Sequence, residues 1–441
     1  MTKSQNKALA FNGQITAFLA LIFILMLSVV GALIESASIQ ITKNRKRADT
    51  ILALESTFAE YHPELLGEYE IFARVGCTED VLRNRLSYYG ADNMEHTMEQ
   101  MQLLTDYNGA PFYQQAVRYM KAWLGVENLT YNSEIDFSKD HKMKEEELGI
   151  SVELERVLGE AGTELPAENN PLKTVENLKK SNLLSILVPE QEALSNQNIT
   201  LEILPSGREL QRGNFAEERN GSTSDKLFFV AYVLEHFTNI TEPKETKKLL
   251  YEQEYLLSGF SSDKENLEAV CKKIVNIRTA LNYTYLLTDS ARQAEAEAMA
   301  LTMCSLIALP EIAEVVKHAL LFAWAYGESI VDTRALLKGK KLPLVKTGES
   351  WQLQLANLVT LGTENEVANE KNSESGISYQ EYLKGLLLLT DGGTLSMRCL
   401  DLMESNLPIK ADQCMTKVEI KSTVNLRRGV QDTFQTTFGY Q

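Results

Sequence analysis

The sequence predicts a mainly helical α+β protein, in which a long N-terminal transmembrane helix continues into a helical body with a few late β-strands. Three observations lead to this prediction. Residues 15–34 form one uncharged, apolar run. Helical spacing of apolar residues, with cap and stop signals, dominates the centre of the chain. Only the C-terminal segment from about Met415 changes to the alternating pattern that is typical of strands.

Residues 15–34 have the length and composition of a membrane span. Twenty residues in a helix cover about 30 Å, the thickness of a hydrocarbon core, and only Thr16 and Ser28 interrupt the apolar character. We therefore expect a tail at residues 1–14, a transmembrane helix at 15–34, and lipid contact at the following positions: Ile15, Phe18, Leu21, Leu25, Val29 and Ile34.

Two other interpretations of this run remain open. A cleaved secretory signal would use Lys3 and Lys7 as its basic start and the small residues 36–38 as a weak cleavage site. The run is longer than the apolar region of such signals, and Glu35 lies just before that site. A buried helix of a soluble protein is the other alternative. Charge leaves the orientation open, because the positive-inside rule favours neither side strongly with these flanking cations: Lys3 and Lys7 before the run, Lys43, Arg45, Lys46 and Arg47 after it.

The rest of the chain is strongly acidic. Of 60 Asp and Glu residues, 59 follow residue 47, against 38 Lys and Arg, which gives that part a formal charge of −21. Such a body repels phosphate backbones and anionic lipid surfaces, so we expect no nucleic-acid partner. The five cysteines are far apart and form no C-x-x-C pair, which argues against a disulfide scaffold and a cysteine-type zinc site.

Residues 35–62 are predicted to extend the transmembrane helix as a stalk. No Pro or Gly occurs between Glu35 and Pro63, and apolar residues recur at spacings of three, four and seven. This apolar stripe must pack on the chain's own body or on a partner. The stripe includes Ala37, Ile41, Ala48, Leu52 and Ala59, with Ile51, Leu54 and Phe58 widening it. The possible contacts in a helix bundle are Glu35, Ile41, Ala48 and Leu52.

Residues 63–441 form the predicted body. We expect further helix over 64–125, a polar insertion or linker at 133–171, loop at 206–224 and a second polar insertion at 362–376. Helices are expected at 225–238, 249–257, 267–287, 291–309, 311–337, 379–390 and about 394–406. Capping boxes at Ser262 and Ser378, each with a Glu three residues later, mark two of the helix starts. No internal repeat is evident.

The sequence carries no pattern typical of catalysis or of a cofactor. It has no H-E-x-x-H, G-x-S-x-G, P-loop, G-x-G-x-x-G or calcium-loop motif, and its five histidines are isolated. The pairs Glu252/Glu254 and Glu295/Glu297 are interpreted as solvated helix faces, and Arg398, Asp401 and Glu404 as a row of ion pairs. We therefore expect no enzyme activity, no cofactor, no metal and no small-molecule substrate.

Several segments together resemble a known family. They are GQITAFLALIFILMLSVVGALIESASIQ (13–40), AEYHPELLGEYEIFA (59–73), EYLLSGFSSDKENLEAVCKKIVNIRTALNYTYLL (254–287), LPLVKTGESW (342–351), and YQEYLKGLLLL and MRCLDLMESN near the C-terminus. The chain resembles an uncharacterised family of Gram-positive membrane-anchored proteins associated with Tad (tight adherence) pilus systems. Its N-terminus is similar to the minor pilins, or pseudopilins, of that apparatus. The resemblance implies a single-pass protein of the cell membrane, with the N-terminus in the cytoplasm and the body outside.

One position departs from the pilin pattern. Type IV-like prepilins carry Glu at the fifth position after the processing Gly, whereas Phe18 occupies that position after Gly13. We therefore predict an uncleaved anchor. Our first hypothesis is a non-enzymatic component of pilus assembly or anchoring, with the bilayer and other pilin-like proteins as partners. The alternatives are a membrane-tethered module that binds a cell-wall polymer or peptide, and an enzyme without a recognisable motif.

Overall fold

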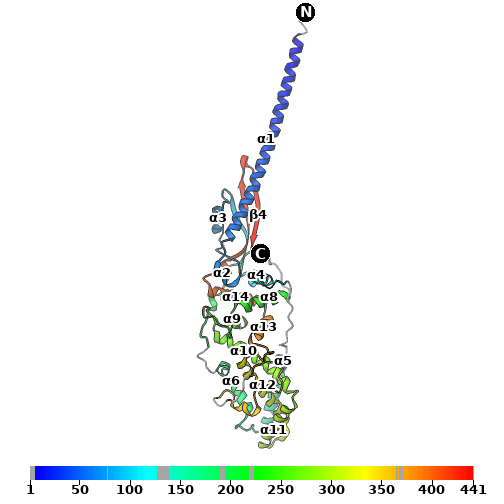
Figure 1. The fold of residues 1–441 in the computed structure, drawn as a ribbon, viewed down its shortest axis with the longest axis vertical. Helices are drawn as coiled ribbons and strands as arrows, with labels where there is room; N and C mark the ends of the chain where they lie inside the picture. Colours follow the sequence, from blue (N-terminus) through cyan, green and yellow to red (C-terminus); the bar gives the residue numbers. More distant parts are fainter. Residues whose placement is uncertain are drawn as a thin grey trace.

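A computed structural model describes most of the chain. It covers residues 5–76, 78–126, 139–188, 194–217, 223–363, 366 and 371–440. The protein is α+β and mainly helical, as the sequence predicts, and it has the shape of an elongated body from which one long helix projects (Figure 1).

The projecting helix is α1, Gln5–Phe58. It confirms the prediction that the apolar run and the stalk form one uninterrupted helix, although it ends three residues before the predicted Tyr61. His62 then caps the short helix α2, Pro63–Tyr69, by accepting a hydrogen bond from the Leu65 amide at its Nδ1 atom. Pro63 occupies the first turn of α2, where its missing N–H costs nothing.

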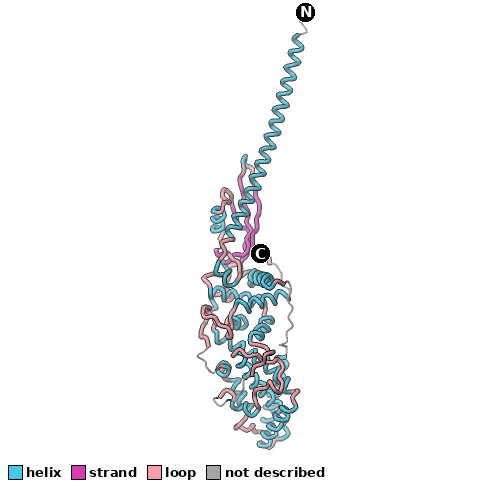
Figure 2. Tube along the Cα trace, in the orientation of Figure 1, coloured by secondary structure: helices cyan, strands magenta, loops and turns pink. Residues whose placement is uncertain are grey.

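A small antiparallel sheet lies where α1 meets the body, and strands from both ends of the chain build it (Figure 2). The strands are β1 (Arg74–Val75), β2 (Glu95–Leu103), β3 (Cys414–Asn425) and β4 (Gln431–Gly439). The central strand is β3, which pairs with each of the other three. The predicted late strands are therefore present as β3 and β4.

We predicted helix throughout residues 64–125, and this prediction is wrong for β2. In β2, the register shifts between Met98 and Gln100 and again between Gln102 and Leu103. Such irregularities break the period of two by which a strand is recognised in a sequence. The rest of this segment is helical, with α3 at Glu79–Tyr88 and α4 at Asp106–Leu124.

The second half of α1 packs on this sheet and on α3. Ala53, Leu54 and Phe58 are buried with β3 residues Met415, Val418 and Ile420. The Phe58 ring lies 4.8 Å from that of Phe438 and 5.2 Å from that of Tyr440, measured between centroids. About three to four turns before Phe58, Lys43 and Arg47 both form ion pairs with Asp432 of β4, at 3.1 and 3.3 Å.

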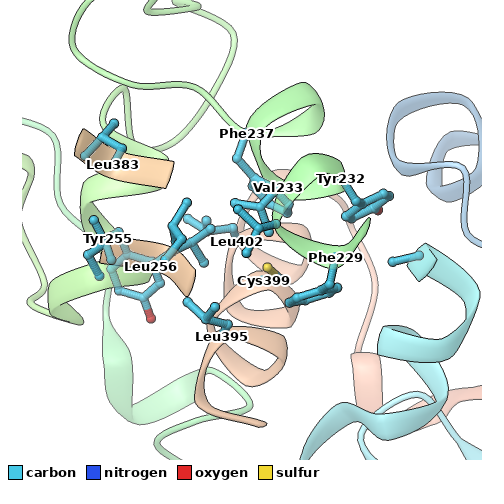
Figure 3. Packing of buried hydrophobic residues seen from close by; sticks show 14 of the residues in the cluster. Phe229, Tyr232, Val233, Phe237, Tyr255, Leu256, Leu383, Leu395, Cys399 and Leu402 are labelled. Atoms are coloured by element: carbon cyan, nitrogen blue, oxygen red, sulfur yellow. The ribbon is translucent and has the colours of Figure 1, made fainter. Parts of the chain in front are cut away.

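Beyond the sheet, a middle core joins α4 to four further helices. These are α8 (Thr223–His236), α9 (Glu252–Ser258), α13 (Tyr379–Leu389) and α14 (Gly392–Asn406). Figure 3 shows the packing, with Phe229 and Val233 of α8 against Cys399 and Leu402 of α14. The predicted capping box is confirmed at α13, where Ser378 and Glu381 each bond to the other's backbone amide.

The distal core is built on three consecutive helices, α10 (Asp263–Leu286), α11 (Ser290–Leu306) and α12 (Ala313–Leu337). Ser262 caps α10 and Asp289 caps α11, as predicted. Pro310 starts a short 3-10 turn, Pro310–Ile312, just before α12. Three further helices cover this core: α5 (Lys139–Ala161), α6 (Pro171–Lys180) and α7 (Leu183–Leu187).

Residues 133–171 were expected to be a polar linker, and the described part of that range is mainly the 23-residue helix α5. Most of its charged residues with described side chains are exposed, while Ile150, Leu154, Val157 and Leu158 pack against the distal core. The helix period was hidden because charged residues outnumber the apolar ones. Residues 133–138 and most of 364–370 lie outside the described residues.

Docking of α1 on the sheet makes a testable prediction. Phe58→Ala removes a buried aromatic side chain, so we expect it to lower the free energy of unfolding by about 3–5 kcal/mol. Leu52→Ala, on the exposed side of the same helix, should change it by less than about 0.5 kcal/mol. Urea unfolding of the full chain in detergent measures both. Equal effects of the two substitutions would contradict this packing.

Candidate functional site

Where its side chains are described, the first half of α1 is not covered by the rest of the protein: residues 14–34 are exposed apart from the half-buried Ile22. The six residues predicted to contact lipid are all exposed, with Ile15 at 52% and Leu21 at 65% of their full exposure. Among the described residues, one helix is long and apolar enough to cross a membrane, and it is this one. Exposed leucine, isoleucine and phenylalanine in such density are stable in hydrocarbon and costly in water.

The second half of α1 has two faces with different roles. The buried face, described above, carries Thr50, Ala53, Leu54, Thr57 and Phe58 and packs on the sheet and α3. Leu54 and Phe58 therefore follow the expectation that the stripe packs on the chain's own body.

The opposite face is exposed and carries apolar residues together with Arg45, which lies about 20° from Leu52 around the helix axis. Ile41 is 68% exposed and Leu52 59%, and Ala48 is exposed too, while Glu35 is half-buried. At 100° per residue, Ile34, Ile41, Ala48 and Leu52 lie within about 40° of one another around the helix axis. We call these four residues the α1 stripe. The stripe begins in the membrane span and runs along the side of α1 that faces away from the sheet.

Carboxylates inside the body are the second feature with chemical potential. Glu252 and Glu254 were interpreted as a solvated face, and this is wrong: both are fully buried. Glu252 accepts hydrogen bonds from the Thr238 amide at 3.0 Å and from Asn406 at 2.8 Å. Glu254 accepts from the Ile240 amide and from the Tyr379 hydroxyl. Because α9 is short and enclosed on all sides, two different helix faces both point into the core.

The predicted ion-pair row on α14 is also wrong. Asp401 is buried and accepts hydrogen bonds from the Tyr255 hydroxyl at 2.7 Å and the Ser206 amide at 2.8 Å. Glu404 pairs with Arg208 of a distant loop, at 2.6 Å, whereas Arg398 donates to the Leu256 carbonyl oxygen. Glu295 and Glu297 are exposed, as expected.

A cavity of about 850 Å³ lies between α5, α6 and α12. Its wall is largely apolar, with Ile150, Leu154, Leu172 and Phe322, and its rim carries ion pairs such as Lys179–Glu147. Phe322 is its one aromatic lining residue among those described. Within the described residues, no three His, Cys, Asp or Glu side chains are grouped as metal ligands.

Burial of Glu254 makes stability depend on pH. Desolvation raises the pKa of Glu254 from 4.5 to about 7, and its Oε2 atom has no partner among the described residues. A raised acid pKa costs nothing below the unfolded value and destabilises the fold increasingly as pH rises from about 4.5 to about 7, above which the cost levels off. We expect Glu254→Gln to stabilise the chain by about 2 kcal/mol more at about pH 8 than at about pH 5.

Urea unfolding at the two pH values measures this difference. The matched control is Glu295→Gln, an exposed carboxylate whose replacement should have a similar small effect at both. The prediction fails if the stability gain from Glu254→Gln is the same at both pH values.

Comparison with known proteins adds a family but no activity. A family model described as a family of unknown function, DUF5702, matches residues 161–426, from the last residue of α5 to just past the end of β3. This segment contains most of the middle and distal cores, but it excludes α1, α4 and all but the end of α5. No curated protein and no solved structure matches the chain. Because the matched segment exceeds half of the sequence, the chain belongs to the DUF5702 family.

Proposed function

We propose that this protein is a non-enzymatic, pseudopilin-like component of a Tad-type pilus assembly or anchoring system. In this proposal it crosses the cell membrane once, with the N-terminus in the cytoplasm and the body outside. Its partners are the lipid bilayer and other pilin-like or pilus-assembly membrane proteins. The sequence resemblance supports the system, and the geometry of α1 supports the mode of action.

The observation that carries the proposal is the exposed α1 stripe. Ile34, Ile41 and Ala48 are spaced by seven residues, the repeat by which helices pack side by side. A neighbouring helix could follow the stripe from the bilayer into the stalk without meeting the body, because the sheet covers the opposite face. Ala48 provides a small side chain at which two helix backbones approach closely.

A fixed helix direction makes this stripe useful for assembly. Lys43 and Arg47 hold α1 to Asp432, and the Tyr440 hydroxyl donates to the Phe58 carbonyl oxygen at 2.5 Å. The body therefore cannot pivot freely about the helix. When α1 enters a bundle of similar helices, the bundle sets the position of every attached body.

Charge on the stripe tests the proposal. Ile41→Lys places a cation on the seam between helices, so we expect loss of crosslinked pilin-like neighbours in membrane pull-downs and loss of pili in electron micrographs of cells. The matched control is Gln40→Lys, which adds the same charge about 100° around the helix. Normal pili and unchanged crosslinks with Ile41→Lys would refute the assembly role.

Orientation has its own test. Leu306, at the far end of α11, is 72% exposed, whereas the cysteines with described side chains are buried. We expect Leu306→Cys to react with a membrane-impermeant maleimide on intact cells, because the body lies outside in this proposal. Reaction only after lysis would place the body in the cytoplasm. The unsubstituted chain is the control for any background labelling.

A membrane-tethered binding module is the alternative, and the cavity between α5, α6 and α12 favours it. Its apolar wall and charged rim suit a wall peptide better than a polymer of sugars, which is usually bound by several aromatic rings. The experiment with Ile41→Lys distinguishes the two functions. Under the alternative, Ile41→Lys leaves pili and neighbouring helices unchanged, since the cavity is distant from α1 (Figure 1).

A further inference from the structure

A lysine and two carboxylates meet in the interior between α10, α12 and the segment 342–353. The side chains of Lys346, Glu328 and Asp332 are completely buried. The Nζ atom of Lys346 lies 2.6 Å from Oε1 of Glu328 and 2.7 Å from Oδ1 of Asp332, and it donates a hydrogen bond to the Ser350 carbonyl oxygen at 3.1 Å. Buried charged groups are costly unless they are closely paired, so these three side chains are held in contact.

The contact between Arg278 and Asp332 shows which of the two carboxylates is left to react with the lysine. The Arg278 guanidinium, also fully buried, donates from Nε and Nη2 to Oδ2 of Asp332 at 2.9 and 2.6 Å. Burial alone would raise the pKa of Asp332, but the charges of Arg278 and Lys346 bring it below its ordinary value. Asp332 is therefore an ionised carboxylate that already has its own cation.

Glu328 differs from Asp332. Burial, and then the negative charge of Asp332, raise the pKa of Glu328, although the neighbouring Lys346 acts in the opposite direction. The Oε1 atom of Glu328 is in hydrogen-bond contact with Nζ of Lys346, so an amine and a carboxyl group, the two reactants of amide formation, lie side by side.

Backbone amides surround the Glu328 carboxyl where negative charge would develop. The Leu353 N–H donates to Oε2 at 2.7 Å, and the Gln352 N–H donates to Oε1 at 3.0 Å and to Oε2 at 3.2 Å. This pair of amides has the arrangement of an oxyanion hole. Gly327 permits it, because a Cβ there would lie 2.2 Å from Leu358 and 2.8 Å from Leu353 and would push this segment away.

We propose that Lys346 and Glu328 form an intramolecular isopeptide bond. The Lys346 amine attacks Cδ of Glu328, and the Gln352 and Leu353 amides stabilise the oxyanion on Oε2. Two protons move from Nζ to Oε1, one directly across their contact and one by way of Asp332, and Oε1 leaves as water. The Nζ–Cδ bond forms and the Cδ–Oε1 bond breaks, so one ammonium and one carboxylate give one amide and one water, with no external reagent.

The reaction depends on how the amine and the carboxyl group are positioned and on the exclusion of water. Groups held in contact by a folded core react as if at very high concentration, up to about 10⁵–10⁸ M in favourable cases. Exclusion of water also removes the solvent that favours the separated ions and would reverse the condensation. The product joins the segment 342–353 covalently to α12 within the distal core. This inference stands independently of the proposed role in pilus assembly.

Intact mass spectrometry of the full chain, purified in detergent and denatured, tests the bond. We expect the wild-type chain to be lighter than its sequence by the mass of one water. Lys346→Arg retains the positive charge, but its guanidinium does not condense with a carboxylic acid at neutral pH, so this variant should have its full sequence mass.

Tryptic mapping locates the bond. We expect peptide 318–334, which contains Glu328, to be joined to peptide 342–371, because trypsin does not cleave after an acylated lysine. Wild-type protein at full sequence mass would overturn the proposal, whatever the variant does. So would a free peptide ending at Lys346, or a water loss that maps to a succinimide at Asp332.

Discussion

Contact between α1 and the sheet determines the geometry of the whole molecule. Only the second half of this helix touches the body (Figure 1), and the described side chains of residues 14–34 are exposed apart from that of Ile22. Asp432, which is nearly buried, joins Lys43 and Arg47 to β4, and the aromatic rings around Phe58 complete the contact. Partly buried, shared ion pairs of this kind hold a geometry more firmly than exposed pairs do. The direction of the membrane span relative to the body follows from them.

The same contact explains why charge could not predict the orientation. Of the four cations that follow the span, Lys43 and Arg47 bind Asp432, and Lys46 binds the Asp92 carbonyl and carboxylate. Their charges are therefore matched by acids of the body instead of by lipid headgroups. The positive-inside rule counts cations without their partners, so it gave equal weight to residues with a structural role.

Local signals in the sequence predicted what depends on neighbouring residues. The continuity of α1 and the caps at Ser262 and Ser378 are of this kind. The sheet depends instead on pairing between residues such as Glu95 and Thr423, which are far apart in the chain. The local pattern of β2 does not indicate which strand it pairs with, and its irregular register hides the alternation of inward and outward residues.

The burial of charged residues is the second feature that the sequence could not predict. Spacing of two residues correctly placed Glu252 and Glu254 on different faces of a helix, but it could not show that both faces of α9 are enclosed. Whether a carboxylate is solvated depends on the elements packed around it, and these come from Thr238, Ile240 and Tyr379 in other parts of the chain. The excess of acidic residues therefore overstates the negative charge of the surface, because several of these acids lie in the interior.

Packing also explains where the recognisable segments lie. Arg278 belongs to the segment 254–287, and it donates hydrogen bonds to the Pro343 and Leu344 carbonyl oxygens and to the Tyr382 hydroxyl. Three of the segments that carry the family resemblance thus meet at one buried side chain. Their residue types are constrained by the interior of the body, which needs no ligand to account for them. The α1 stripe has no such internal partner, so packing within the body does not account for its apolar character.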